Sequence, residues 1–171
     1  MFEKNGVTFF LRAMPLIAEK VDVEAVIVGD GPERQKLEAL AASLELTERV
    51  QFLGARRHDE MPALLSSAEL AVFPSLMEAT SVAALESMAC ELPVAASEVG
   101  GLPEIVDNEV GALFEAGNPT ALAAAVTGLL ERDDLGALGV AARSRVVEQW
   151  SNARLVDRHL EVYQDLVAHG H

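Results

Sequence analysis

The chain has 171 residues, 50% of them hydrophobic and 23% charged, which is enough for one well-buried domain and too few for two. Acidic residues outnumber basic residues 27 to 13, and the net charge of -14 argues against nucleic acid and anionic lipid as partners. The single cysteine, Cys90, cannot form an intramolecular disulfide, and no apolar stretch approaches the roughly 20 residues that span a bilayer, so we expect one domain over residues 1–171, in a reduced cytoplasmic setting and without a membrane span.

Strands alternate with helices along the chain. The β-branched run at residues 21–28 ends in the turn cluster Gly29-Asp30-Gly31-Pro32, whose proline favours the start of a helix. The next segment carries its apolar residues at the spacing of one helical face. The predicted strands are residues 21–28, 49–53, 70–74, 93–97 and 111–114. The predicted helices are residues 33–44, 59–68, 81–90, a brief one after the turn at 100–104, 120–132, 135–147 and 152–167.

This alternation predicts an α/β fold, because parallel strands need crossover connections and are covered by helices on both faces. We expect a doubly wound parallel sheet, Rossmann-like, in a single domain. Ligands of such sheets bind at the carboxyl ends of the strands. The loops that matter should therefore follow Val28, Leu53, Pro74 and Ser97.

The cluster at Gly29 and Gly31 has the first two glycines of a dinucleotide fingerprint, but Arg34 stands at the third position. One interpretation is a tight turn into a helix. The other is a helix N-terminus that opens on the binding crevice and helps to place a phosphate.

Glu86 is the only charge in the predicted helix 81–90, which is otherwise apolar or small on nearly every face. Such a pattern predicts a buried helix, in which a lone carboxylate is costly unless a partner satisfies it. Three partners are open: a distant arginine, water at the helix edge, or the vicinal diol of a ribose in the crevice.

Glu78 lies in the loop before that helix, among small residues that leave backbone N–H groups free for phosphate oxygens. A carboxylate beside a phosphate would be repelled, so Glu78 either reaches past it to a hydroxyl-bearing group or merely complements the helix dipole. The sequence has no Asp-x-Asp and no His or Cys pair at ligand spacing, so we expect no metal site and no cofactor.

Residues 70–106 resemble the donor-binding C-terminal domain of family 4 (group 1) glycosyltransferases, which have the two-domain GT-B fold. The similar features are two glutamates seven residues apart in a strand, loop and helix, then a Pro-Val strand and a Gly-Gly-x-Pro-Glu turn. Residues 26–34 and 50–54 also look like that family. The resemblance covers most of the chain.

The resemblance implies a retaining, metal-independent transfer from a nucleotide sugar. It implies that Glu86 binds the ribose, that Glu78 binds the transferred sugar and that Lys4 neutralises the leaving diphosphate. The backbone amides expected at the diphosphate are those of Ala79, Thr80, Ser81 and Val82. The glycines expected at the donor site are Gly29, Gly31 and Gly54, with the loop after Gly54 along the base.

The chain also departs from the family pattern. The family arginine that precedes Lys4 and the N-terminal acceptor domain are absent, so we expect this polypeptide to be inactive alone. Ala79-Thr80-Ser81 stands where most family members have a glycine and an aromatic residue, so the identity of the transferred sugar and of the acceptor stays open.

The alternative functions are a non-catalytic regulatory or assembly module and a nucleotide-sugar 2-epimerase-like domain. The apolar stripe of the last helix, 152–167, predicts self-association when the missing domain does not cover it.

Overall fold

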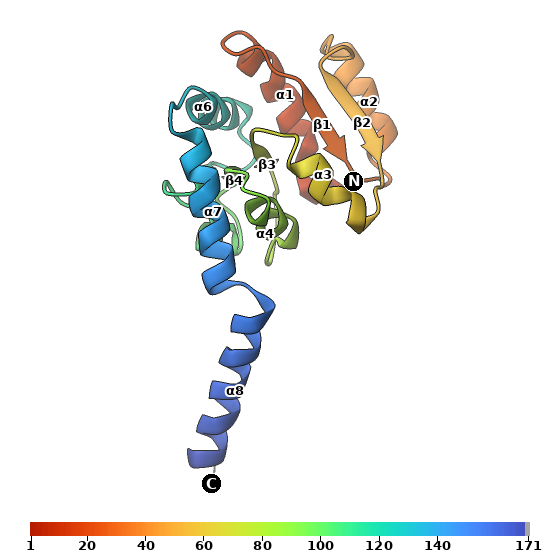
Figure 1. Cartoon of the computed structure of the whole chain (residues 1–171). Helices are drawn as coiled ribbons and strands as arrows, with labels where there is room; N and C mark the ends of the chain where they lie inside the picture. The colour runs from red at the N-terminus through yellow and green to blue at the C-terminus, as the bar shows by residue number, and fades with distance from the viewer. Residues whose placement is uncertain (170–171) are drawn as a thin grey trace.

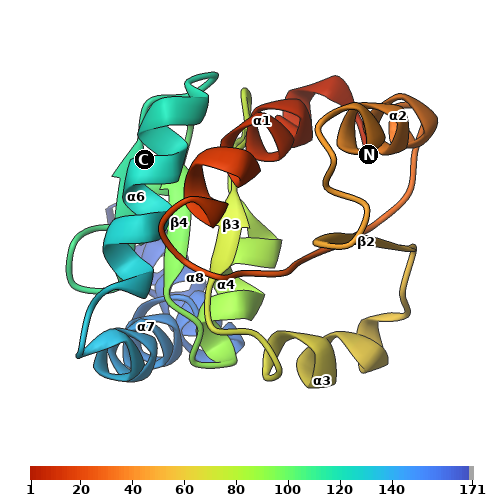
Figure 2. The ribbon, with the colours of Figure 1, turned by 90° about the horizontal axis from the view of Figure 1, so that it is seen from above.

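Parallel strands lie between two layers of helices in the computed structural model, which describes residues 1–169 (Figures 1 and 2). The strands are β1 (Ala25–Val28), β2 (Val50–Gly54), β3 (Ala71–Phe73), β4 (Val94–Ser97) and β5 (Gly111–Phe114). The helices are η1 (Glu3–Asn5), α1 (Val7–Ala18), α2 (Arg34–Ser43), η2 (His58–Glu60), α3 (Met61–Leu65), α4 (Val82–Ala89), α5 (Leu102–Ile105), α6 (Pro119–Leu130), α7 (Leu135–Gln149) and α8 (Asn152–His169). The predicted α/β class with parallel strands is confirmed.

The strands form two hydrogen-bonded groups instead of the one sheet that the sequence predicts. One group is the parallel pair β1-β2, and the other has the order β3-β4-β5, also parallel. β1 pairs with β2, and β3 pairs with β4. At the start of these strands the Ala25 N–H donates to the Arg49 carbonyl at 2.7 Å, and the Ala71 N–H donates to the Pro93 carbonyl at 3.0 Å. Within residues 1–169, β1 and β3 are not paired with each other.

β4 separates the two halves of the core, because successive side chains of a strand point to opposite faces. Val94 and Ala96 pack in the cluster that contains Met88 of α4. Ala95 packs in the other cluster, with Met14 of α1. The strand β4 is therefore packed on both faces, one in each cluster.

The sequence analysis did not predict α1, which packs against α6 and α2. The signal was present, since Leu11, Met14 and Ile17 are fully buried at the spacing of one helical face. Pro15 lies inside the helix and removes one backbone donor there. This helix joins the two strand groups, because its neighbours α2 and α6 flank different groups.

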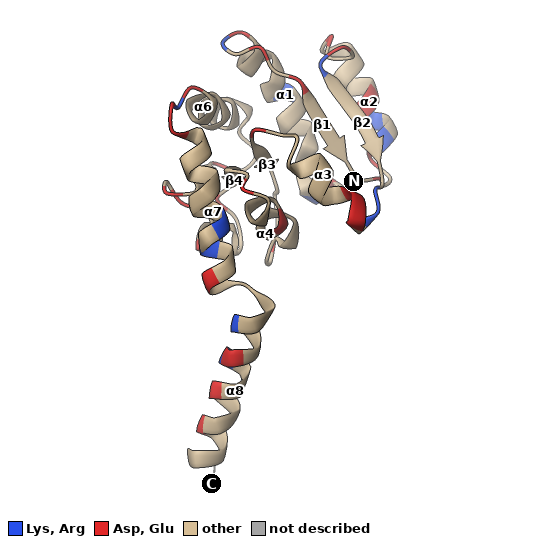
Figure 3. Cartoon of the chain, in the orientation of Figure 1, with Lys and Arg blue, Asp and Glu red and all other residues tan. Residues whose placement is uncertain are grey.

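α8 extends away from the rest of the chain (Figure 1). Its predicted apolar residues are all at least half exposed: Leu155, Leu160, Tyr163 and Leu166. Acidic side chains lie along it, with arginines only in its first half, and Lys and Arg elsewhere are dispersed among carboxylates (Figure 3). Among the described residues, no helix is both long and apolar enough to cross a membrane. The self-association expected from this stripe stays a prediction.

Candidate functional site

The first residues of the chain cross the carboxyl ends of both strand groups. The Met1 carbonyl accepts from the Glu33 N–H, after β1, at 3.4 Å. The Lys4 carbonyl accepts from the Leu76 N–H, after β3, at 2.8 Å. The structure therefore brings Lys4, whose side chain is exposed, to the loop that carries Glu78.

The loop between β3 and α4 presents Glu78 at the edge of the molecule. Glu78 is half-buried, and its Oε2 accepts a hydrogen bond from the Ser75 hydroxyl at 3.4 Å. Its neighbours Met77 and Ala79 are exposed. Oε2 is thus held by Ser75, while Oε1 has no hydrogen-bond partner among the described residues and can accept from a ligand.

α4 begins at the end of this loop with Ser81 as its N-cap. The Ser81 hydroxyl accepts from the Ala84 N–H at 3.4 Å. The preceding Thr80 and the first helical residue, Val82, are both exposed. The first N–H groups of a helix have no intrahelical acceptor, so this exposed end offers donors and positive potential to an anion.

Glu86 is not buried, and the prediction of a helix buried on nearly all faces is wrong. Its side chain is 36% exposed, and its Oε1 lies 3.6 Å from Nδ1 of His58. α4 packs with β3, β4 and α7, but it is not covered all round, because Val82, one turn before Glu86, is 63% exposed. Glu86 therefore reaches water at the helix edge, one of the three possibilities, with a histidine and not an arginine beside it.

His58 is a site neighbour that the sequence analysis did not connect with Glu86. It lies in η2, four residues after the end of β2, and its side chain is 85% exposed. Its position at the carboxyl end of a strand was the available signal. The distance of 3.6 Å is too long for a hydrogen bond, so the Glu86 carboxylate remains free to accept from other donors.

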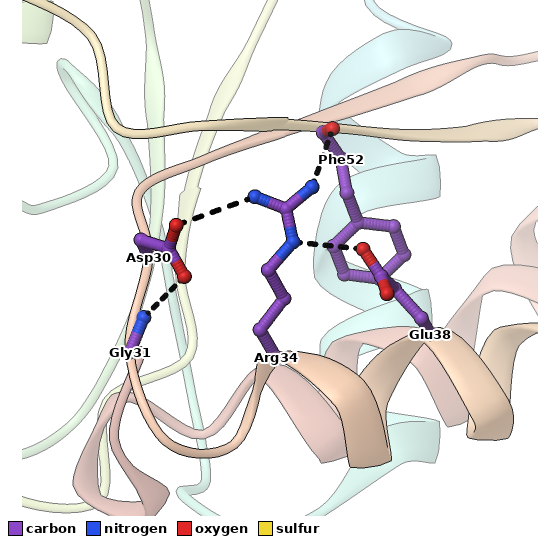
Figure 4. A network of polar contacts seen from close by, with 5 residues as sticks. All are labelled: Asp30, Gly31, Arg34, Glu38 and Phe52. Atoms are coloured by element: carbon purple, nitrogen blue, oxygen red, sulfur yellow. Dashed lines mark hydrogen bonds and ion pairs between the residues drawn. The ribbon is translucent and has the colours of Figure 1, made fainter.

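The turn after β1 is fixed by Arg34 (Figure 4). Its guanidinium donates to Glu38 at 2.8 Å and to the Phe52 carbonyl of β2 at 3.3 Å, and it lies 3.5 Å from Asp30. The hydrogen bond with Glu38 is the main reason that the pKa of Arg34 is raised above its ordinary value. The residue that breaks the dinucleotide fingerprint thus ties the turn to β2, which supports the tight-turn interpretation.

The three candidate glycines lie around this turn. A Cβ on Gly31 would meet the Met1 nitrogen at 2.1 Å, and one on Gly54 would meet Nη1 of Arg34 at 2.7 Å. A Cβ on Gly29 would meet nothing within 4 Å. Gly31 and Gly54 therefore permit close packing of the chain itself, and a role of any of the three in binding a donor stays a prediction.

Two shallow hollows elsewhere do not coincide with these residues. One lies on α8, beside Val162 and Leu166, and the other lies beside Asp22 and Arg49, at the amino ends of β1 and β2. Within residues 1–169, no three His, Cys, Asp or Glu side chains are arranged to hold a metal ion. Cys90 is a free, partly buried thiol, and a reduced setting stays a prediction.

Comparison with known sequences identifies relatives along most of the chain. Residues 1–132 match the family described as Glycosyl transferases group 1. The chain is 33% identical over 159 residues to N-acetyl-alpha-D-glucosaminyl L-malate synthase of Bacillus anthracis, an alignment that covers 92% of the chain and 41% of that protein. It is 38% identical over 156 residues to D-inositol 3-phosphate glycosyltransferase of Salinispora tropica, covering 86% of the chain and 32% of that protein. The chain thus spans about two fifths or less of the length of these curated relatives.

Solved structures share its fold. Sucrose-phosphate synthase from Thermosynechococcus elongatus matches with a TM-score of 0.86 and 30% identity over 98% of this chain and 43% of that one. HepE of Anabaena, in complex with UDP, matches with a TM-score of 0.87 and 25% identity over 96% and 46%. The C-terminal domain of LpcC, a group 1 family glycosyltransferase from Francisella tularensis, matches with a TM-score of 0.79 and 25% identity over 89% and 83%. The chain has the fold of the C-terminal part of GT-B glycosyltransferases, and it belongs to the group 1 glycosyltransferase family.

Proposed function

We propose that this chain is the donor-binding half of a retaining glycosyltransferase that transfers a sugar from a nucleoside-diphosphate sugar to an acceptor. The observation that carries the proposal is the convergence of Lys4, the Glu78 loop and the exposed N-terminus of α4 at the carboxyl ends of the strands. The structural match to HepE with bound UDP supports a nucleoside diphosphate as the ligand class.

Glu86 binds the ribose in this proposal. An ionised carboxylate has two acceptor oxygens and suits a vicinal diol, which has two donors. Glu86 is open to solvent on the outer side of α4, and no ion pair with Lys or Arg occupies it among the described residues. The loop that carries His58, after Gly54, then lies beside the base.

The diphosphate lies between Lys4 and the start of α4, where the amides of residues 79–82 can donate. Departure of the nucleoside diphosphate from the anomeric carbon places growing negative charge on its phosphate oxygens. An ammonium group and helix-terminal N–H groups stabilise that charge more strongly than they stabilise the bound substrate. This arrangement needs no metal ion. Glu78, on the loop before α4, receives the hydroxyls of the transferred sugar.

The chain alone does not turn over in this proposal, because the acceptor site belongs to polypeptide outside these 171 residues. The relatives are more than twice as long as the region that they share with it. Donor binding is thus the activity to test first. Weak binding is expected, since one wall of the cleft would be supplied by the other domain.

Calorimetric titration with UDP, GDP and ADP tests the proposal directly. We expect one of them to bind at millimolar concentration, and we expect Glu86→Gln to weaken that binding roughly 10-fold or more, because a hydrogen bond to a charged group contributes about 1.5–3 kcal/mol. Glu69→Gln is the matched control, since Glu69 is exposed and lies before β3, at the opposite ends of the strands.

Two results would contradict the proposal. If none of the three diphosphates binds, the non-catalytic module becomes the better interpretation. If Glu69→Gln weakens binding as much as Glu86→Gln does, the effect is one of overall charge, and Glu86 does not contact the ribose.

A further inference from the structure

The loop that carries Glu78 is fixed to three separate elements. The Leu76 N–H donates to the Lys4 carbonyl of η1 at 2.8 Å. The Gly101 N–H, in the turn after β4, donates to the Ala79 carbonyl at 3.0 Å. The Ser97 hydroxyl, at the end of β4, donates to the Ser75 carbonyl at 2.6 Å. A connection between β3 and α4 that has no regular structure of its own is therefore held along its length.

The attachment at Ser75 is the most deeply buried of the three. Ser97 is fully buried and Ser75 is 4% exposed. A hydroxyl has one proton, so Ser97 donates mainly through its short bond to Ser75 and only weakly to the Phe73 carbonyl at 3.4 Å. Because β4 is bonded on both sides and all four of its residues are buried, this bond fixes the Ser75 backbone to the most completely buried of the described strands.

The turn after β4 packs directly against the backbone of the loop that carries Glu78. A Cβ on Gly100 would lie 1.5 Å from the Glu78 carbonyl oxygen, and one on Gly101 would lie 2.4 Å from the Ala79 carbonyl oxygen. The loop backbone therefore rests directly on the backbone of the turn. This close approach restricts the backbone at Glu78 but does not contact its carboxylate, whose direction depends on the side-chain rotamer.

The Ser75 hydroxyl is the group that acts on that rotamer. It donates to Oε2 of Glu78 at 3.4 Å, a long bond that can restrict the side chain without binding it tightly. Glu78 is half-buried and makes no ion pair with the described residues, so no other charged side chain competes for its direction. The chain of contacts runs from Ser97 to Ser75 and from Ser75 to Glu78.

We propose that Ser75 is a positioning residue that aims the Glu78 carboxylate at the sugar of the bound nucleotide sugar. This inference rests on the proposed function, in which Glu78 contacts the transferred sugar. Since Ser75 acts only through Glu78, it contributes to affinity for the sugar nucleotide and not to affinity for the nucleoside diphosphate. Ser75 therefore contributes to the preference of the site for a sugar nucleotide over the corresponding nucleoside diphosphate.

The test compares each sugar nucleotide with its own diphosphate by calorimetry. The pairs are UDP-glucose and UDP, GDP-mannose and GDP, and ADP-glucose and ADP. For the pair that binds, we expect Ser75→Ala to weaken the sugar nucleotide roughly threefold to tenfold, the effect of one hydrogen bond, and to leave the diphosphate within about twofold. Glu78→Ala, which removes the acceptor of the Ser75 hydroxyl, should give a selective loss at least as large, and Ser75→Ala should add nothing in the Glu78→Ala background.

Ser87→Ala is the matched control, because Ser87 is also a buried serine but donates to the Ala83 carbonyl of its own helix at 2.9 Å. It should leave both affinities unchanged. A thermal melt of each variant checks that the fold persists.

Each other outcome overturns the inference in a recognisable way. If Glu78→Ala is selective and Ser75→Ala is silent, the positioning role alone fails and the proposed function stands. If Ser75→Ala weakens the diphosphate as much as the sugar nucleotide, Ser75 only supports the fold. If the unmodified chain binds no member of any pair, the proposed function fails and the role of Ser75 fails with it.

Discussion

The two strand groups have similar sequences but different surroundings. All four residues of β4, from Val94 to Ser97, are buried, whereas Val26 of β1 is 54% exposed and only Ile27 of that strand is buried. β4 has a hydrogen-bonded neighbour on each side and a helix layer on each face, and β1 has a neighbour on one side only. The difference teaches that a short, largely apolar run can specify a strand, while the burial of that strand depends on how many neighbours pack against it.

The candidate site combines parts from both groups. Glu78 and Glu86 follow β3 and are supported by β4 and its turn. His58 follows β2, in the less buried group. Apart from Lys4 of η1, the residues proposed to contact the sugar and the diphosphate thus lie on the better supported half, and the loop proposed for the base lies on the other.

The largest effect is expected from a substitution at the close contact between β4 and β5 in the three-strand group. A Cβ on Gly111 of β5 would lie 1.9 Å from the Val94 carbonyl oxygen, so Gly111→Ala must push β5 away from β4. We expect it to lower the free energy of unfolding by about 3 kcal/mol, the upper range for overpacking. Chemical denaturation measures this change.

Gly128→Ala is the control for that substitution. Gly128 lies exposed in α6, and a Cβ there would meet nothing within 4 Å. Alanine should therefore stabilise the chain by about 0.5–1 kcal/mol through its helix propensity. Equal effects of the two substitutions would contradict the tight contact between β4 and β5.

A smaller effect is expected when the same substitution, Val→Ala, is made in each strand group and the two losses of unfolding free energy are compared. Val94→Ala removes two methyl groups from a fully buried site, and we expect it to cost about 2 kcal/mol. Val26→Ala makes the same change at a position that is 54% exposed, and we expect a cost below about 0.5 kcal/mol. Urea titration of both variants decides the comparison, and similar losses would mean that β1 is covered in solution.

The smallest expected effect concerns one ion pair beside each strand group: Arg145–Asp107 beside β3-β4-β5, and Arg49–Asp22 beside β1-β2. Arg145 of α7 is 15% exposed and lies 2.9 Å from Asp107, before β5. Burial acts to raise the pKa of Asp107, but hydrogen bonds from Arg145 and from the Glu109 N–H outweigh it, so the pKa lies below the ordinary 3.8. Because the folded-state pKa is the lower one, this carboxylate stabilises the fold above about pH 4, and the contribution is lost as the pH falls through the folded-state pKa.

We therefore expect Asp107→Asn to lower the free energy of unfolding at pH 7 by about 0.5 kcal/mol, the range of a half-exposed pair. The difference from the unmodified chain should shrink as the pH falls below 4. Asp22→Asn changes the corresponding pair with Arg49 in the other group, where the carboxylate is 91% exposed, and no measurable loss is expected. Denaturation curves at several pH values measure both, and a loss that grows toward low pH would be the opposite of this expectation.

Much of the fold was predictable because its signals are local. The last strand, Gly111–Phe114, has the predicted bounds, and the other predicted strands and helices are present with shifts at their ends. The longest shift is in the first strand, where only Ala25–Val28 of residues 21–28 is paired. α1 was not predicted, although Leu11, Met14 and Ile17 lie at the spacing of one helical face.

The candidate site was predictable only in part. The spacing of Glu78 and Glu86, a loop residue and a helix residue, follows from the chain itself. The exposure of Glu86 does not, because it depends on which side of α4 finds β3, β4 and α7. His58 and Ser97 come from other elements, and contacts between distant residues leave no periodic signal in one sequence.

The sequence by itself determined the alternation of strands and helices, the family pattern of two glutamates and the acidic character, since each of these depends on residue types at short spacing. The tertiary structure alone decided that the strands divide into two groups, that Glu86 reaches solvent beside His58, and that the Glu78 loop is fixed through Ser75 and Ser97. The physical reason is that burial and hydrogen bonding at these places are set by neighbours far along the chain, whose approach depends on the packing of β4 and its flanking helices.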